Sequence, residues 1–79
     1  MDLVAVVEAV MWCLMADERI RTPEAAWQAL SLAQNEYADY DGTEKLSGHA
    51  EAMRVLLRHA SMENIIRAMY QAQDNIEYG

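Results

Sequence analysis

TPEAAW, Thr22–Trp27, marks the clearest helix start in the chain. Thr22 is a favoured N-cap, Pro23 suits the first helical position, and Glu24 puts negative charge in the first turn. The residues that follow on one helical face are Ala26, Leu30, Ala33 and Tyr37, with Trp27 beside them. This spacing predicts a helix that ends in YADYDG, residues 37–42, where Asp and Gly favour a turn.

Upstream, residues 2–15 are predicted to form a helix that is apolar on almost every side. One stripe consists of Leu3, Val7, Val10 and Leu14. The other side consists of Val4, Glu8, Met11, Trp12 and Met15. A helix that is apolar all round is covered on all sides. Either this helix is central and wrapped by the others, or its second face binds another copy or another protein. Glu8 is expected at the rim of that face, and Cys13 is expected to be a small buried side chain.

Downstream, two more helices complete the predicted fold. One starts near Thr43 or Ser47 and runs to about His59, and the next starts after the N-cap Ser61. The expected inner face of the last helix consists of Met62, Ile65, Ile66, Met69, Ala72 and Ile76. The closing residues NIEYG are expected to fray. The sequence therefore predicts an all-α fold, a compact bundle of three to four short helices in one domain over residues 1–79.

Net charge restricts the class of partner. Thirteen Asp and Glu face six Lys and Arg, which gives a net charge of −7. Such a surface repels nucleic acid and anionic membranes and attracts basic surfaces, including those of proteins that hold DNA or RNA. The region from Glu24 to Glu51 holds one basic residue, Lys45, so a DNA-recognition helix is not expected there.

Cysteine content and hydropathy favour a cytoplasmic protein. Cys13 is the single cysteine, which rules out an internal disulfide and is typical of a reducing compartment. The apolar run over residues 3–16 is too short to span a bilayer, follows no basic segment and contains Glu8. We expect no membrane association.

The stretch NEYADYDGTE, residues 35–44, holds four carboxylates and two tyrosines. With Gly42 at the sixth position of a calcium loop, position 1 would be Tyr37 and position 12 Gly48, so both end ligands are missing. An inter-helix turn explains the aspartates and the glycine. Tyrosines beside carboxylates also fit a partner-binding acidic edge. The residues of this acidic edge are Glu36, Tyr37, Asp39, Tyr40, Asp41 and Glu44.

No pattern typical of catalysis, of a cofactor or of a metal site stands out. His49 and His59 lie almost three turns apart on one predicted helix, so they cannot share a metal ion. With one cysteine elsewhere, no zinc ligand set can be assembled. The chain also lacks a nucleophile elbow and a glycine-rich phosphate loop. We expect a protein that is not an enzyme and binds no cofactor.

A local resemblance concerns ADERIRTPE, Ala16–Glu24. Ala16, Asp17, Ile20 and Glu24 match the turn that follows an apolar helix in TerB-like helical domains, which this stretch resembles. Glu18 stands where that family has glycine. The resemblance covers nine residues, implies a pair of helices joined by this turn, and carries no functional site across.

Two functional hypotheses follow. In the first, the acidic edge occupies a basic nucleic-acid-binding surface of a partner complex and blocks it, as phage-encoded anti-defence proteins such as anti-CRISPR proteins do. In the second, the chain is a homo-oligomeric structural or regulatory subunit, or an adaptor, that binds through the helix over residues 2–15. A homodimer through that helix is one form of the second hypothesis.

Overall fold

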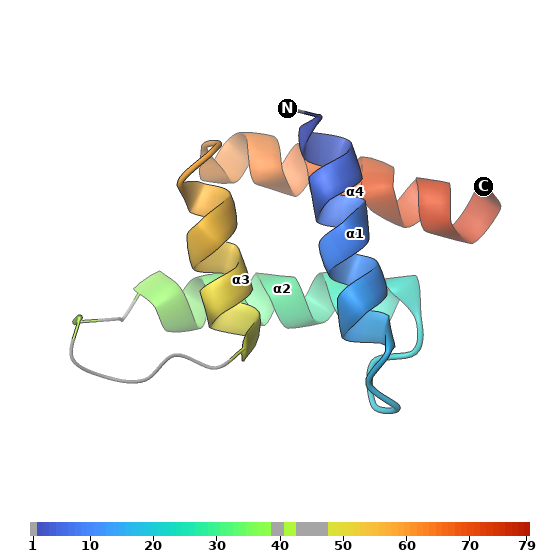
Figure 1. The fold of residues 1–79 in the computed structure, drawn as a ribbon, viewed down its shortest axis with the longest axis horizontal. Coiled ribbons are helices and arrows are strands. Elements are labelled where there is room, and N and C mark those ends of the chain that lie inside the picture. Colours follow the sequence, from blue (N-terminus) through green and yellow to red (C-terminus); the bar gives the residue numbers. More distant parts are fainter. Residues whose placement is uncertain (1, 39–40, 43–47) are drawn as a thin grey trace.

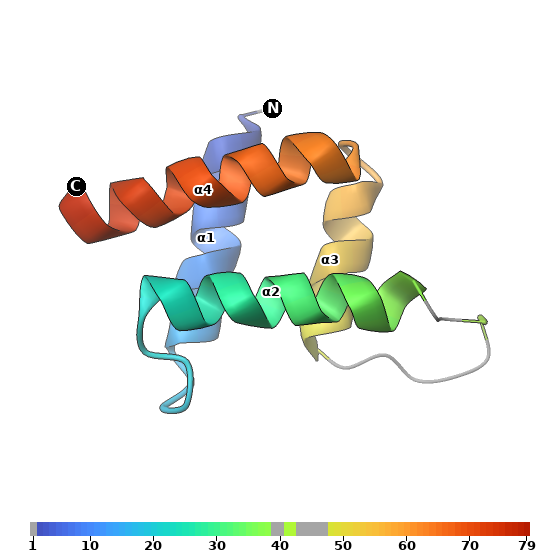
Figure 2. The ribbon, with the colours of Figure 1, turned by 180° about the vertical axis from the view of Figure 1, so that it is seen from behind.

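The computed structural model describes residues 2–38, 41–42 and 48–79, which form four helices and no strand. The helices are α1 (Leu3–Met15), α2 (Pro23–Ala38), α3 (Gly48–Leu57) and α4 (Met62–Tyr78). Figure 1 shows α1 and α3 side by side on one face, with α2 and α4 crossing behind them. In the opposite view, α2 and α4 lie in front (Figure 2). The all-helical prediction is confirmed.

The two layers are joined by crossed contacts. The closest packing is that of α1 on α4 and of α3 on α2, while α1 and α3 touch each other little. The molecule measures 40 × 29 × 16 Å, and its short dimension accommodates two helix layers separated by about 8–10 Å. Each helix therefore has one side toward the other layer and one side toward solvent.

Side-chain caps fix where three helices begin. Asp2 Oδ1 accepts hydrogen bonds from the backbone N–H of Val4 at 3.1 Å and of Ala5 at 3.3 Å. Thr22 Oγ1 accepts from the N–H of Ala25 at 3.1 Å, and Ser61 Oγ from the N–H of Asn64 at 3.3 Å. The helix starts predicted at Thr22 and Ser61 are confirmed. The starts proposed at Thr43 or Ser47 lie outside the described residues.

The core lies between the layers and draws on every helix. It consists of Val7, Met11, Ile20, Ala26, Leu30, Ala33, Ala50, Met53, Leu56, Ile65, Ala68, Met69 and Ala72. Three of these are methionines with almost no exposure, and their unbranched side chains suit the irregular space between crossed helices. The turn after α1 adds Ile20, which its N–H bond to the carbonyl of Asp17, at 2.9 Å, helps to hold in place.

Two expectations about helix ends and faces are wrong, and a third differs from the structure by two residues. The closing residues do not fray: α4 continues to Tyr78, and the N–H of Gly79 donates to the carbonyl of Asn75 at 2.9 Å. Ile66 lies on the outer face of α4 with 39% of its surface exposed, because Ile65 and Met69 point into the core. α3 ends at Leu57, two residues before the predicted end, and a turn follows.

Candidate functional site

The acidic edge lies at the end of α2 and in the connection that follows. Glu36 and Asp41 are exposed, and Tyr37 is half-buried. Gly42 has a φ of 92°, a left-handed conformation that favours glycine and supports the interpretation of a turn. Asp39, Tyr40 and Glu44 lie outside the described residues, so the arrangement of the whole edge stays a prediction.

The second face predicted for α1 is divided between core and surface. Met11 is fully buried, so assigning it to an outer binding face was wrong, while Val4 is half-buried and packs against the core. The reason is that the buried line of α1 runs through Val7 of the predicted stripe and Met11, one turn later, while Leu3, Val10 and Leu14 pack against the core only partly buried. The wrapped central helix is also wrong, since Ala5, Ala9 and Trp12 are exposed.

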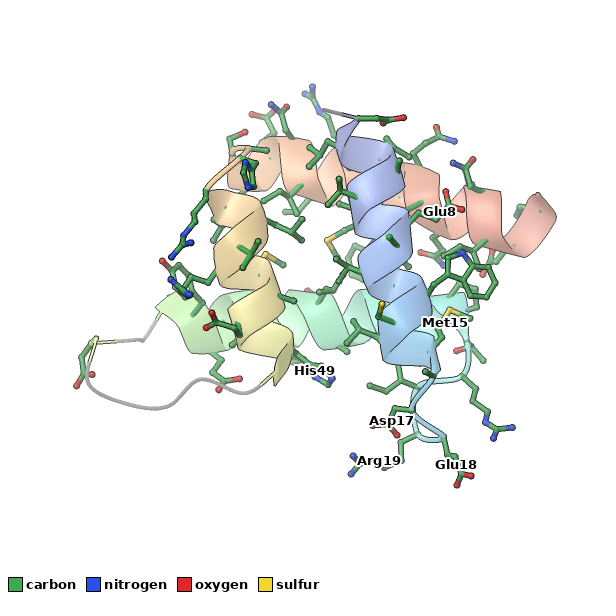
Figure 3. All side chains as sticks on the ribbon, in the orientation of Figure 1. Glu8, Met15, Asp17, Glu18, Arg19 and His49 are labelled. Atoms are coloured by element: carbon green, nitrogen blue, oxygen red, sulfur yellow. The ribbon has the colours of Figure 1, made fainter. Side chains whose placement is uncertain are left out.

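The remaining residues of that face are Glu8, Trp12 and Met15. Glu8 and Met15 are half-buried, and Figure 3 shows both on the side of α1 that faces away from α3. Asn75 of α4 donates a hydrogen bond from Nδ2 to Glu8 Oε2 at 3.4 Å, which places Glu8 at the rim as expected. Trp12 is 53% exposed and, with Met15, Ala16 and Arg21, lines a hollow of about 400 Å³.

A larger apolar groove is lined by residues of α1 and α3, the two helices that lie in front in Figure 1. Its volume is about 520 Å³, and the residues that line it include Val6, Val10 and Cys13 of α1 and His49 and Ala52 of α3. Cys13 is exposed in this groove, which contradicts the expectation of a buried thiol. Sequence reasoning missed the groove because it depends on how far apart the two helices pack.

A third feature, also missed from the sequence, lies between α2 and α4 on the opposite face. The rings of Trp27 and Tyr70 meet there with centroids 5.1 Å apart and planes tilted by 48°. A hollow of about 220 Å³ beside them is lined by Glu24, Trp27, Gln28, Tyr70 and Gln73. The sequence did contain one signal of this surface. Ile66, Tyr70 and Gln73 follow one another at helical spacings of four and three residues, so they share the outward face of α4. The contact between Trp27 of α2 and Tyr70 of α4 could not be predicted from the sequence.

Most described arginines are engaged with carboxylates of their own segment. Nη2 of Arg19 lies 3.1 Å from Asp17 Oδ2, and Nη2 of Arg21 lies 3.7 Å from Glu18 Oε1. Two further ion pairs join Arg54 to Glu51 within α3 and Arg67 to Glu63 within α4. Among the described residues no charged side chain is buried, so the excess of carboxylates lies at the surface.

Two of these carboxylates have perturbed pKa values. The pKa of Asp17 is lowered, chiefly by the Arg19 side chain, with a further contribution from the Arg19 N–H at 2.9 Å. The pKa of Glu51 is lowered by its hydrogen bonds from Arg54, one of which is 3.0 Å long. Figure 3 shows Asp17, Glu18 and Arg19 at the tip of the α1–α2 turn, with His49 at the near end of α3.

Within residues 2–38, 41–42 and 48–79, no three His, Cys, Asp or Glu side chains gather in a way that could hold a metal ion. No helix in the same ranges is long and apolar enough to cross a bilayer. Comparison of the chain with protein-family models, with curated proteins and with solved structures gives no match. The TerB-like resemblance of the α1–α2 turn therefore rests on its nine residues alone.

Proposed function

We propose that this protein is a small, acidic, non-catalytic protein-binding module that occupies a basic, nucleic-acid-binding surface of a partner complex. In its most concrete form it is an inhibitor of the phage anti-defence or anti-CRISPR type, active in the host cytoplasm. The observation that carries the proposal is the charge distribution. The chain has a net charge of −7, no charged side chain among the described residues is buried, and four arginines are paired locally with carboxylates.

Local pairing matters because it reduces the reach of the positive charges. An arginine beside a carboxylate presents a dipole to a distant partner, and its field decays quickly in physiological salt. The surplus carboxylates still repel phosphate and attract lysine and arginine. A basic groove built for nucleic acid is therefore a suitable partner, and direct binding of nucleic acid is not expected.

The acidic edge is the candidate contact within this surface. Glu36 and Asp41 are exposed at the end of α2 and beyond it, where a partner can reach them. In the proposal, Glu36, Asp39, Asp41 and Glu44 stand in for phosphates, while Tyr37 and Tyr40 add contact area. Tyrosine suits this role because it supplies a large amphipathic surface.

The test compares two triple charge reversals in a capture experiment with tagged protein in bacterial lysate. One variant changes Asp39, Asp41 and Glu44 to Lys, and the matched control changes Glu18, Glu63 and Asp74 to Lys. Both raise the net charge equally. We expect the edge variant to lose capture of a nucleic-acid-binding complex and the control to retain most of it. Unchanged capture by the edge variant would refute the role of the edge.

The groove between α1 and α3 favours a second candidate, a homo-oligomeric or regulatory subunit that binds through α1. An apolar groove of about 520 Å³ can receive side chains of a second copy. Sedimentation velocity separates the candidates. A dimer that Ala9→Glu dissociates would support the subunit role, because Ala9 lines the groove and is exposed. A monomer at all concentrations would exclude the homo-oligomeric form of this candidate.

A further inference from the structure

The notch between α2 and α4 combines an aromatic surface with acidic groups. We call the hollow lined by Glu24, Trp27, Gln28, Tyr70 and Gln73 the aromatic notch. It lies on the face seen in Figure 2, where the start of α2 runs beside the C-terminal half of α4. Its volume of about 220 Å³ is roughly seven times the share of one water molecule in the liquid, about 30 Å³. One long side chain fits into it.

Two of the five residues that line the notch, Trp27 and Tyr70, are aromatic. Tyr70 is 59% exposed, so one side of its ring remains accessible, while the other packs toward Trp27. The indole N–H of Trp27 is buried and has no hydrogen-bond partner among the described residues. Aromatic faces carry partial negative charge and attract cations, Trp and Tyr among the strongest. The ring pair therefore offers a surface for a flat cation.

The charged groups around the notch are acidic. Glu24 lines it directly, and Glu77 is brought to it through Gln73, whose Nε2 donates to Glu77 Oε1 at 3.5 Å. Arg67, one turn before Tyr70, donates to Glu63 Oε1 at 2.7 Å, so its charge is engaged on its own helix. A cation that enters the notch therefore meets carboxylates, and Arg67 repels it little because its charge is paired with Glu63.

From this geometry we infer that the aromatic notch binds an arginine side chain projecting from the basic partner. The guanidinium stacks on Tyr70 and Trp27, and it donates hydrogen bonds to Glu24. Arginine fits better than lysine, because its planar, weakly hydrated group stacks on aromatic rings and binds carboxylates through two N–H groups. The inference rests on the proposed function for its partner class and names a contact separate from the acidic edge.

The first test is an NMR titration of ¹⁵N-labelled protein with N-acetyl-arginine amide, with the citrulline analogue as the neutral control. We expect saturable shifts of the Trp27 indole N–H and of backbone amides around Glu24, Tyr70 and Gln73. The citrulline analogue should produce no saturable shift. Arginine shifts spread evenly over all acidic segments, with none that saturates at the notch, would overturn the inference.

Variants locate the contact. Tyr70→Ala should raise the Kd for N-acetyl-arginine amide about three- to tenfold, and Tyr70→Phe should leave it nearly unchanged, because the ring is retained. Glu24→Gln should raise it about two- to fivefold. The matched controls are Tyr78→Ala, an exposed tyrosine of the same helix, and Glu18→Gln, and both should bind as the parent does. Equal weakening by the controls would contradict the notch.

The two proposals fail in distinguishable ways. Loss of lysate capture in the edge variant together with intact arginine titration at the notch supports both. If arginine binds at the notch but no basic partner is captured, the inference about the notch is supported and the inhibitor function is refuted. If capture depends on the acidic edge but arginine causes no localised NMR shift at the notch, the proposed function is supported and the inference about the notch is refuted.

Discussion

At the scale of single residues, Trp27 is the most informative side chain of the molecule. It lines the aromatic notch, contacts Tyr70 and also lines a small hollow that Met53, Ile66 and Met69 share. Its indole N–H is buried without a partner among the described residues, and an unpaired buried donor costs about 1–3 kcal/mol. A residue that the sequence marked only as a neighbour of a helical stripe thus connects the core with a surface feature.

Trp27→Phe tests this assignment. Phenylalanine removes the unpaired donor and keeps an aromatic ring, so the lost packing of the larger ring is offset in part. We expect the free energy of unfolding to change by less than about 1 kcal/mol, measured by urea denaturation with Trp12 fluorescence. A loss above about 2 kcal/mol would contradict this balance between the removed donor and the lost packing.

Asp17 provides a residue-scale prediction of pH dependence. Its pKa is lowered in the folded state by Arg19, so its contribution to stability is present above the unfolded-state pKa and is lost as pH falls through the folded-state value. Arg19→Gln should move the pKa of Asp17 upward toward its ordinary value, measured by NMR pH titration of side-chain carboxyls. Glu51, held low by Arg54, should titrate unchanged in the same sample. An unmoved Asp17 would contradict the contact.

At the scale of helices, boundaries follow from the sequence more closely than faces do. Thr22 and Ser61 could be recognised as caps, because each hydroxyl accepts a hydrogen bond from an N–H only three residues later. The contact therefore depends on the local sequence alone. The end of α4 was not predicted: NIEYG holds one strong helix former, Glu77, yet the helix continues there, with Ile76 packed against the core. Tertiary contact overrode weak local propensity.

α1 shows why faces are harder to predict. With apolar residues on nearly all sides, periodicity alone could not decide which stripe enters the core, and the buried pair is Val7 and Met11. The same limitation hid the groove between α1 and α3. Both depend on the angle and spacing at which α1 rests on α4 and α2, which no local pattern specifies.

Neighbouring residues of α1 should therefore respond differently to truncation. Met11→Ala removes a fully buried side chain and should cost about 2–5 kcal/mol of unfolding free energy. Trp12→Ala removes one that is 53% exposed and should cost less than about 1.5 kcal/mol. Chemical denaturation with Trp27 fluorescence measures both variants. A larger loss for Trp12→Ala would mean that α1 is rotated relative to the structure.

At the scale of the whole molecule, a thin two-layer fold gives most charged residues access to solvent. Its shortest dimension is 16 Å, and no described charged side chain is buried. The fold class could be predicted from the sequence because breakers are few and two caps are clear. The acidic character could be predicted from composition. The notch could not, because it requires residues 24–28 and 70–73, distant in the chain, to meet across two helices.

Competition on the captured complex tests whether the protein and nucleic acid occupy the same basic surface of the partner. Tagged protein is bound to a partner isolated from bacterial lysate, and DNA or RNA of the kind that the partner binds is then added in increasing concentration. We expect nucleic acid to displace the protein, and the protein in turn to block nucleic-acid binding, because both occupy one basic surface. Simultaneous binding of protein and nucleic acid, with no mutual displacement, would contradict the claim.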